Sequence, residues 1–93
     1  MGAFSGLGRR RKIAAAGALR RAGDAAGAVD ALAPILADTP DDPAANVEMA
    51  RALQLLEDFA GAEEHYRRAI REQLDYVLVI ELAGAVGTQG RAK

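Results

Sequence analysis

The sequence predicts an all-α fold in which about five helices form antiparallel helix-turn-helix repeats. The main observation is an internal repeat: residues 23–30 (Gly-Asp-Ala-Ala-Gly-Ala-Val-Asp) return 34 positions later as residues 57–64 (Glu-Asp-Phe-Ala-Gly-Ala-Glu-Glu). Leu19 matches Leu53 at the same step. In addition, the segments between turns are rich in Ala and Leu, which favour helices, and the strand-like C-terminal segment has no partner strand. A period of this length indicates stacked pairs of helices.

The first helix should follow a frayed N-terminus. Residues 1–8 contain three Gly and one Ser, so we expect this end to be flexible. The first helix is predicted over about residues 10–22, where Ala and Leu dominate. Gly23 then ends it by adopting a left-handed conformation.

The second helix is predicted over about residues 25–37. Asp24 precedes it and can cap it by accepting a hydrogen bond in the first turn. Pro34 removes one backbone donor, so we expect a kink or an early end there. The helix should bury one face, formed by Val29, Leu32, Ile35 and Leu36.

The second pair of helices repeats this design. Residues 39–43 (Thr-Pro-Asp-Asp-Pro) predict a turn with Asp42 as N-cap and Pro43 in the first helical position. The third helix then covers about residues 43–56 and carries Val47, Met49, Ala50, Leu53 and Leu56. Asp58 caps a fourth helix that ends near Arg71. Its surface should hold two i,i+4 ion pairs worth a few tenths of a kcal/mol each, Glu63/Arg67 and Glu64/Arg68.

The segment of residues 76–86 is apolar almost throughout. Its β-branched residues are compatible with a buried strand, but the repeat phase predicts a fifth helix, frayed beyond Gly87. If Ile80 and Ala83 pack on the fourth helix, the other large apolar residues of this segment cannot all be buried within the chain (Val77, Leu78, Leu82 and Val86). Because an exposed apolar patch usually marks an interface, we expect a homodimer through residues 76–86 or a partner that covers them.

The composition limits the class of protein. Ninety-three residues suit a single domain, and the absence of Cys fits a reducing, cytoplasmic location. The apolar runs are shorter than the ~20 residues that a membrane span requires, so no transmembrane segment is expected. Residues 1–23 contain six basic residues and no acid. A mitochondrial presequence has a similar composition, but its cleavage would remove part of the repeat.

The sequence offers little catalytic chemistry. His65 is the only histidine, and we expect it to be an ordinary surface residue because a catalytic base requires an orienting partner. No metal ligand follows it at i+3 or i+4, so no metal site is expected. Gly2, Gly6 and Gly8 lack the preceding strand of a phosphate-binding loop. We therefore expect no enzyme activity and no cofactor.

With two helices per 34 residues and small residues at the packing positions, the chain resembles the tetratricopeptide repeat family. The second unit carries the family pattern best, on Met49, Ala50, Leu53, Ala62, Tyr66 and Ala69. The first unit matches at Ala15, Ala16, Leu19, Ala28, Leu32 and Pro40. The two units depart from the pattern where Lys12 in the first and Asn46 in the second replace a large residue, and where Leu74 replaces the closing Pro of the second. The resemblance implies a TPR-like α-solenoid with units at residues 9–42, 43–76 and 77–90, between flexible ends at 1–8 and 91–93.

The resemblance also implies a function. The first helix of each pair in this family lines a concave groove that holds peptides, so we expect a non-catalytic protein-interaction scaffold. The matching positions are Arg10, Ile13, Gly17, Arg20, Arg21, Val47, Arg51, Gln54, Leu55, Leu78, Glu81 and Ala85. Because Arg binds carboxylates through a bidentate fork, an acidic or C-terminal peptide is the expected ligand. The carboxylate clamp that grips acidic chaperone tails is not expected, because Ile13, Gly17 and Glu48 replace its Lys and Asn residues.

Two alternatives remain beside this scaffold. One is a self-assembling subunit that uses residues 76–86. The other is a basic-tailed adaptor, because the run Arg9 to Lys12 can attract nucleic acid or an anionic membrane surface. Four adjacent cations without aromatic neighbours give weak, non-specific attraction, so no specific nucleic-acid partner is expected. Cations are unfavourable at a helix N-terminus, and the predicted helix start gives this run no structural role.

Overall fold

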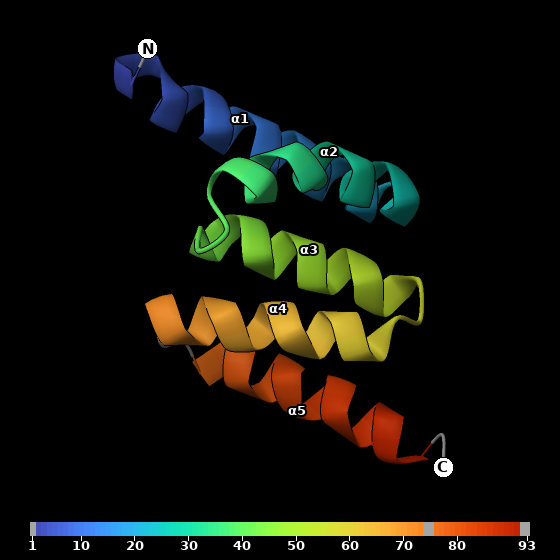
Figure 1. The fold of residues 1–93 in the computed structure, drawn as a ribbon. Helices are drawn as coiled ribbons and strands as arrows, with labels where there is room; N and C mark the ends of the chain where they lie inside the picture. The colour runs from blue at the N-terminus through green and yellow to red at the C-terminus, as the bar shows by residue number, and fades with distance from the viewer. Residues whose placement is uncertain (1, 74–75, 92–93) are drawn as a thin grey trace.

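The computed structural model describes residues 2–73 and 76–91, with side chains for residues 7–73 and 77–88. Five α-helices follow one another in this part of the chain, each antiparallel to the next (Figure 1): α1 (Gly2–Arg21), α2 (Ala25–Asp38), α3 (Pro43–Leu55), α4 (Phe59–Glu72) and α5 (Tyr76–Arg91). No strand occurs among the described residues. The all-α prediction is therefore confirmed, and residues 76–86 form a helix rather than a strand.

The helix starts follow the predicted caps. The Asp24 carboxylate accepts a hydrogen bond from the Gly27 amide at 2.8 Å, and the Asp58 carboxylate accepts one from the Gly61 amide at 3.0 Å. Asp42 caps α3 in the same way through the Ala45 amide, at 3.0 Å. These caps satisfy amides that a helix leaves unpaired in its first turn. The sequence that repeats after 34 residues therefore corresponds to the capped turn within each pair of helices.

Three expectations about the helix bounds differ from the structure. Helix α1 begins at Gly2 instead of near Arg10, so residues 2–8 extend the helix. Of the two outcomes expected at Pro34, a kink or an early end, the early end is wrong, because α2 passes through Pro34 and ends at Asp38. Pro34 has no N–H to donate to the carbonyl oxygen of Asp30, and Asp30 is a residue that is exposed to solvent. Helix α5 also continues past Gly87, to Arg91.

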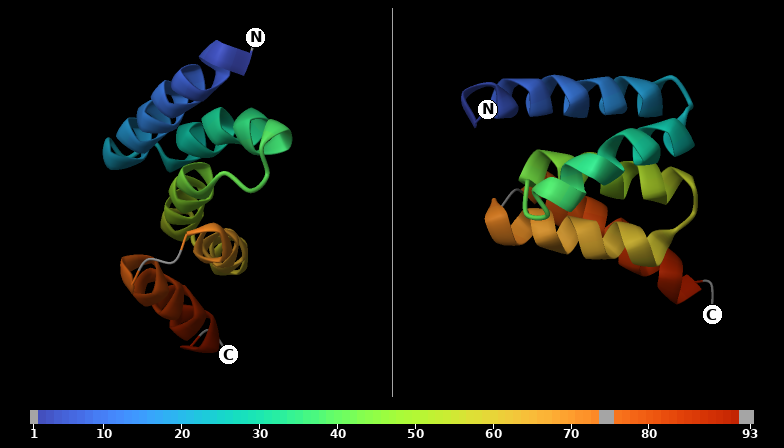
Figure 2. Two further views of the ribbon diagram at one scale, coloured as in Figure 1. Left: turned by 90° about the vertical axis from the view of Figure 1, so that its left-hand side faces the viewer. Right: turned by 45° about the horizontal axis from the view of Figure 1, so that its top comes forward.

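The helices stack so that α1, α3 and α5 lie along one side of the molecule and α2 and α4 along the other (Figure 2). Two apolar clusters fill the interior, one shared by α1, α2 and α3 and the other by α3, α4 and α5. Alanine dominates both clusters, and small side chains allow helices to approach closely. The alanines with at most 1% exposure are Ala16, Ala28, Ala45, Ala50, Ala52, Ala62, Ala69 and Ala85.

Helix α5 packs in a different register from the one expected. Leu78 and Ala85 are buried and Leu82 packs beside them, whereas Ile80 is 71% exposed and Ala83 is exposed. The condition considered in the sequence analysis, that Ile80 and Ala83 pack on α4, is therefore not met. The inward residues of α3 at matching positions are Ala45, Met49 and Ala52. Leu78, Leu82 and Ala85 follow them by 33 positions, whereas the repeat period is 34.

The length of the preceding connection accounts for this change of register. Residues 39–42 join α2 to α3, whereas residues 73–75, one fewer, join α4 to α5. Removing one residue turns the following helix by about 100° relative to the repeat phase. That turn buries the large Leu78 and Leu82 and carries Ile80 to the surface.

Candidate functional site

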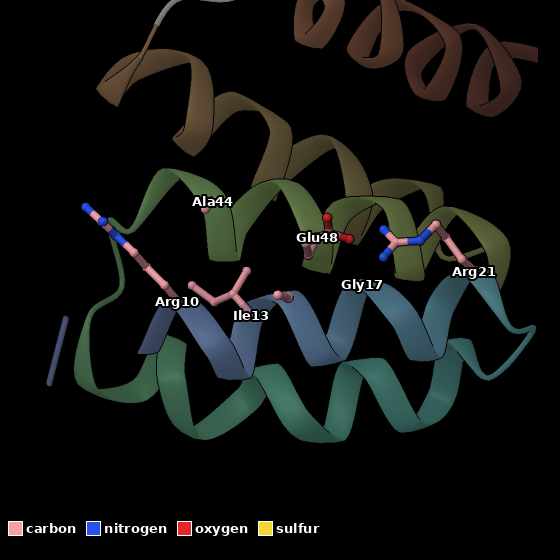
Figure 3. Close-up of a pocket in the computed structure, with 7 residues that line it drawn as sticks. Arg10, Ile13, Gly17, Arg21, Ala44 and Glu48 are labelled. Carbon is pink, nitrogen blue, oxygen red and sulfur yellow. The ribbon is translucent and has the colours of Figure 1, made fainter. Parts of the chain in front are cut away.

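A pocket of about 320 Å³ lies between α1 and α3 (Figure 3). The residues that line it are Arg10, Ile13, Ala14, Gly17, Arg21, Ala44 and Glu48. Four of these, Arg10, Ile13, Gly17 and Arg21, were expected from the sequence as groove residues. Ala44 and Glu48 were missed, although they lie three residues before Val47 and Arg51 on the same helix and share their side of it.

Gly17 forms the floor of this pocket. A Cβ atom added at Gly17 would lie 3.2 Å from Nη1 of Arg21 and 3.2 Å from Oε2 of Glu48. The missing side chain therefore leaves room for a guanidinium group and a carboxylate to lie close to the backbone of α1. Figure 3 shows these two side chains converging over Gly17.

A chain of ion pairs crosses the same side of the molecule. Nε of Arg20 lies 3.0 Å from Oε1 of Glu48, and Oε2 of Glu48 lies 3.9 Å from Nη1 of Arg51. Arg51 in turn donates from Nε and Nη2 to the two carboxylate oxygens of Glu81, both at 3.0 Å. The hydrogen bond to Glu81 raises the pKa of Arg51 above its ordinary value. These pairs connect α1, α3 and α5.

This arrangement corrects one expectation about the arginines. Arg20 and Arg51 were expected to line the groove and to present their charge to an acidic ligand. Instead both are largely buried, with 17% and 30% of their side chains exposed, and they tie neighbouring helices together. Arg10 and Arg21 are exposed, and the described residues contain no ion pair to either of them.

The remaining predicted residues divide between the interior and the surface. Leu78 and Ala85 are buried in the second apolar cluster, so they do not form a surface for a partner. Val47 packs against that cluster, and Gln54 accepts a hydrogen bond from the Tyr66 hydroxyl at 2.9 Å. Only Leu55, at 60% exposure, is open to solvent. The site thus concentrates at the α1–α3 pocket.

The basic run Arg9 to Lys12 is split by the helix that carries it. Because α1 begins at Gly2, these residues lie within the helix and not at its N-terminus. Nε of Arg9 lies 2.7 Å from Oδ2 of Asp42, which ties α1 to the turn before α3. Consecutive helical residues point about 100° apart, so Arg10 reaches the pocket while Arg11 and Lys12 are exposed elsewhere around α1.

A buried polar network between α3 and α4 was missed by the sequence analysis. Asn46 is fully buried, and its Nδ2 donates to the carbonyl oxygens of Pro40 and Asp42 at 2.9 and 3.0 Å. Its Oδ1 lies 2.7 Å from Nδ1 of His65. His65 is therefore half-buried and bridges two helices, and the expectation of an ordinary surface histidine is wrong. Asn46 gave a signal, since it departs from the family pattern at an apolar position.

Tyr66 is the second polar group held inside this helix pair. The side chain is fully buried, and its hydroxyl donates to Oε1 of Gln54 on α3. Burial and the charge of Glu81 raise the pKa of Tyr66 to about 12. The hydroxyl is consequently protonated at any physiological pH and serves as a donor, not as a base.

The described part of the chain contains no group of three or more residues placed to hold a metal ion. None of its helices is long and apolar enough to cross a membrane. The pocket contains two guanidinium groups, one paired carboxylate and an apolar floor. Such a set can bind an anionic group beside small apolar side chains.

The comparison with protein families agrees with the observed architecture. The tetratricopeptide repeat model matches residues 19–83, which is more than half of the chain. No curated protein and no solved structure gives a significant match. Repeats of this type generally mediate protein–protein interactions and typically form non-catalytic scaffolds. With five antiparallel helices, a 34-residue internal repeat and this match, the chain belongs to the tetratricopeptide repeat family.

Proposed function

We propose that this chain is a non-catalytic protein-interaction module that binds a short acidic peptide across α1 and α3. The observation that carries the proposal is the α1–α3 pocket, with the unpaired guanidinium groups of Arg10 and Arg21 at its rim and Gly17 as its floor. Glu48 at the same pocket is neutralised by Arg20 and Arg51, so its charge does not cancel that of the rim.

The spacing of the two free arginines defines the ligand further. Eleven positions separate Arg10 from Arg21, which places their Cα atoms about 16 Å apart along α1. An extended peptide advances about 3.3 Å per residue, so acidic groups about five residues apart would reach both guanidinium groups. Ile13 and Ala14 line the wall between them, and small apolar residues in the middle of the peptide fit that wall.

The test is a binding measurement with an array of peptides in which the number and spacing of acidic residues vary. The expected best ligands carry two acidic residues about five positions apart. Each charge-assisted hydrogen bond is worth about 1.5–3 kcal/mol, so Arg10→Glu with Arg21→Glu should weaken binding at least about tenfold. Arg67→Glu, at an exposed position on α4, is the matched control. Equal affinities for the two variants would contradict the proposal.

Two glycine substitutions on α1 distinguish binding in the pocket from general electrostatic attraction. Gly17→Ala places a methyl group between Arg21 and Glu48, whereas Gly8→Ala on the same helix meets nothing within 4 Å. Gly8→Ala should stabilise α1, because Ala is favoured over Gly in helices by about 1 kcal/mol, whereas at Gly17 this gain is opposed by the displacement of Arg21 and Glu48. Only Gly17→Ala should weaken peptide binding. If both variants bind like the original chain, the ligand does not enter the pocket.

The adaptor to nucleic acid or an anionic membrane is the weaker candidate. Its basis was four adjacent cations, and the helix directs them to different sides and pairs Arg9 with Asp42. Binding that is independent of peptide sequence and disappears at moderate salt would favour this candidate instead. A cytoplasmic location accords with a chain that has no Cys.

A further inference from the structure

A hydrogen-bond donor and a hydrogen-bond acceptor lie together at the floor of the α1–α3 pocket. The donor is the guanidinium group of Arg21, and the acceptor is Oε2 of Glu48. A Cβ atom at Gly17 would lie 3.2 Å from Nη1 of Arg21 and 3.2 Å from this oxygen, so both atoms border the same small space. Figure 3 shows the two side chains directed toward each other over Gly17.

Oε2 of Glu48 is an acceptor that the described part of the chain leaves open. The other oxygen, Oε1, accepts a hydrogen bond from Nε of Arg20 at 3.0 Å. Nη1 of Arg51 is 3.9 Å from Oε2, which is too long for a hydrogen bond. Only 16% of the Glu48 side chain is exposed, so water has little access to Oε2. A ligand that supplies a donor would therefore satisfy a largely shielded acceptor.

Arg21 supplies the donor beside the same floor. Its guanidinium group has several N–H donors, and it forms no ion pair with any residue that the structure describes. Nη1 can therefore donate to a ligand group at the floor while the remaining N–H groups bind an acidic residue at the rim. The floor thus offers one donor and one acceptor to a single ligand group.

This pair selects a neutral group that is both a donor and an acceptor. A ligand carboxylate at the floor would meet the carboxylate of Glu48, and a ligand cation would meet Arg21, and like charges repel at close range. An apolar group would cover both polar groups and leave them unpaired. A carboxamide has an oxygen that accepts from Arg21 and a nitrogen that donates to Glu48.

The geometry of α1 gives the position of this group in the peptide. Acidic side chains bound at the rim keep the peptide backbone outside the pocket, so only a side chain reaches the buried Gly17. Gly17 follows Arg10 by seven positions and precedes Arg21 by four, which is about 10 Å and about 6 Å along the helix. At about 3.3 Å per residue, the carboxamide belongs to the third residue from the acid at Arg10 and the second from the acid at Arg21.

We propose that the peptide bound by this pocket carries glutamine or asparagine between its two acidic residues, with the carboxamide paired to Arg21 and Glu48. This assignment rests on the proposed function, since it concerns the middle of the same peptide. It gives the pocket a selectivity that general electrostatic attraction does not provide. The basic rim attracts every additional acid, whereas the floor rejects an acid at this one position.

The first test measures the affinity of the full chain for peptides that differ at one position. They have the sequence Asp-Ala-Ala-X-Ala-Asp or the reverse order Asp-Ala-X-Ala-Ala-Asp, where X is Gln, Glu, Lys or Leu. In one of the two orders, the Gln peptide should bind at least about tenfold more tightly than the Glu peptide. General attraction to the rim gives the opposite result, because Glu adds a negative charge. A Glu, Lys or Leu peptide that equals the Gln peptide in both orders would overturn the proposal.

The second test changes the floor of the pocket. Glu48→Gln replaces the carboxylate by a group of the same size that can donate to a ligand carboxylate, so the preference for Gln over Glu should disappear or reverse. Glu64→Gln removes the same charge at an exposed position of α4 and should keep the preference. Gly17→Ala fills the floor without changing a charge and should also abolish it, which covers a failure of Glu48→Gln to fold. A preference that persists in both floor variants would overturn the proposal.

The same measurements separate a failure of the carboxamide site from a failure of the proposed function. If no peptide binds, or if Arg10→Glu with Arg21→Glu leaves every affinity unchanged, the proposed function is wrong and the carboxamide site falls with it. If binding depends on these two arginines but not on the residue at X, only the carboxamide site is wrong.

Discussion

The side of α3 that α4 covers and the exposed face of α5 occupy matching repeat positions, 33 residues apart, but they differ in chemistry. The covered side of α3 consists of Asn46, Val47, Ala50, Leu53 and Gln54. The exposed face of α5, which we call the open face, consists of Val79, Ile80, Ala83, Val86 and Gly87. On α3, two of the five positions carry polar side chains, Asn46 and Gln54, and each has a partner on α4. On α5, Val79 and Gly87 take these two places and all five residues are apolar. Polar groups fix the register of a contact that is always made. On an apolar face, only shape complementarity determines which surface can pack against it.

The largest effect is expected when the buried polar residue of α3 is replaced by the apolar residue that α5 has at the matching position. Asn46→Val removes the donor to two carbonyl groups and the acceptor of His65. Because each buried group left unpaired costs about 1–3 kcal/mol, the free energy of unfolding should fall by about 2–4 kcal/mol in chemical denaturation. The reverse change on the open face, Val79→Asn, should alter the stability of the monomer by less than about 0.5 kcal/mol. Similar losses at both positions would show that the two faces are equally covered.

The second prediction concerns the packing that makes α3 and α4 a tight pair. Ala62 has no exposed surface and lies in the cluster with Ala50 and Tyr66. Ala62→Leu should therefore overpack the contact and cost about 1–3 kcal/mol of unfolding free energy. Ala60→Leu, two residues earlier and exposed, should have little effect. An unchanged melting temperature for Ala62→Leu would place that residue outside the contact.

The turns and the helix order could be predicted because they depend on local chemistry. Asp24, Asp42 and Asp58 are caps whatever surrounds them, and each was observed as expected. Ala62 and Tyr66 were placed correctly because the family resemblance already described their packing. The predicted face of α2 was also confirmed, with Leu32, Ile35 and Leu36 buried and Val29 packed beside them.

The pairing of charges and the register of α5 could not be predicted. Arg20 meets Glu48 across 28 positions, and Arg51 meets Glu81 across 30, because the helix stack brings them together. The register of α5 depends on the connection at residues 73–75, which is one residue shorter than the connection at 39–42. A prediction that assumes a constant 34-residue period does not detect this difference. The pocket was located in part, since Arg10 and Arg21 lie on it, but its floor depends on the approach of Glu48 to Gly17.

A third prediction follows from the paired charges. Arg51→Glu removes the hydrogen bonds to Glu81. It also places three carboxylates close together, namely those of Glu48, Glu81 and the substituted residue. The loss of stability should be about 1–2 kcal/mol, because the pair is only partly shielded from solvent. Arg67→Glu, in the exposed ion pair of α4, should cost less than about 0.5 kcal/mol. If the two variants have the same denaturation midpoint, the ion pairs between helices contribute nothing to the stack.

The smallest effect is expected from the protonation of His65. Asn46 uses its amide hydrogens on two carbonyl groups, so its Oδ1 must accept the Nδ1 proton of His65. Burial, followed by the charge of Arg68, lowers the pKa of His65 below 6.5. The unfolded chain therefore takes up the proton first as the pH falls. Stability is complete above pH 6.5 and declines as the pH falls through the folded pKa.

The only histidine of the chain allows that decline to be measured directly. Its imidazole resonances should titrate in NMR spectra below pH 6.5, and Arg68→Gln should move the midpoint towards 6.5 because it removes the repelling charge. His65→Gln should flatten the loss of stability in the same pH window, whereas Glu64→Gln, which removes an attracting charge, should lower the midpoint further. A midpoint above 6.5 in the folded chain would mean that His65 is not held between α3 and α4. The polar side of α3 would then be as open as the face of α5.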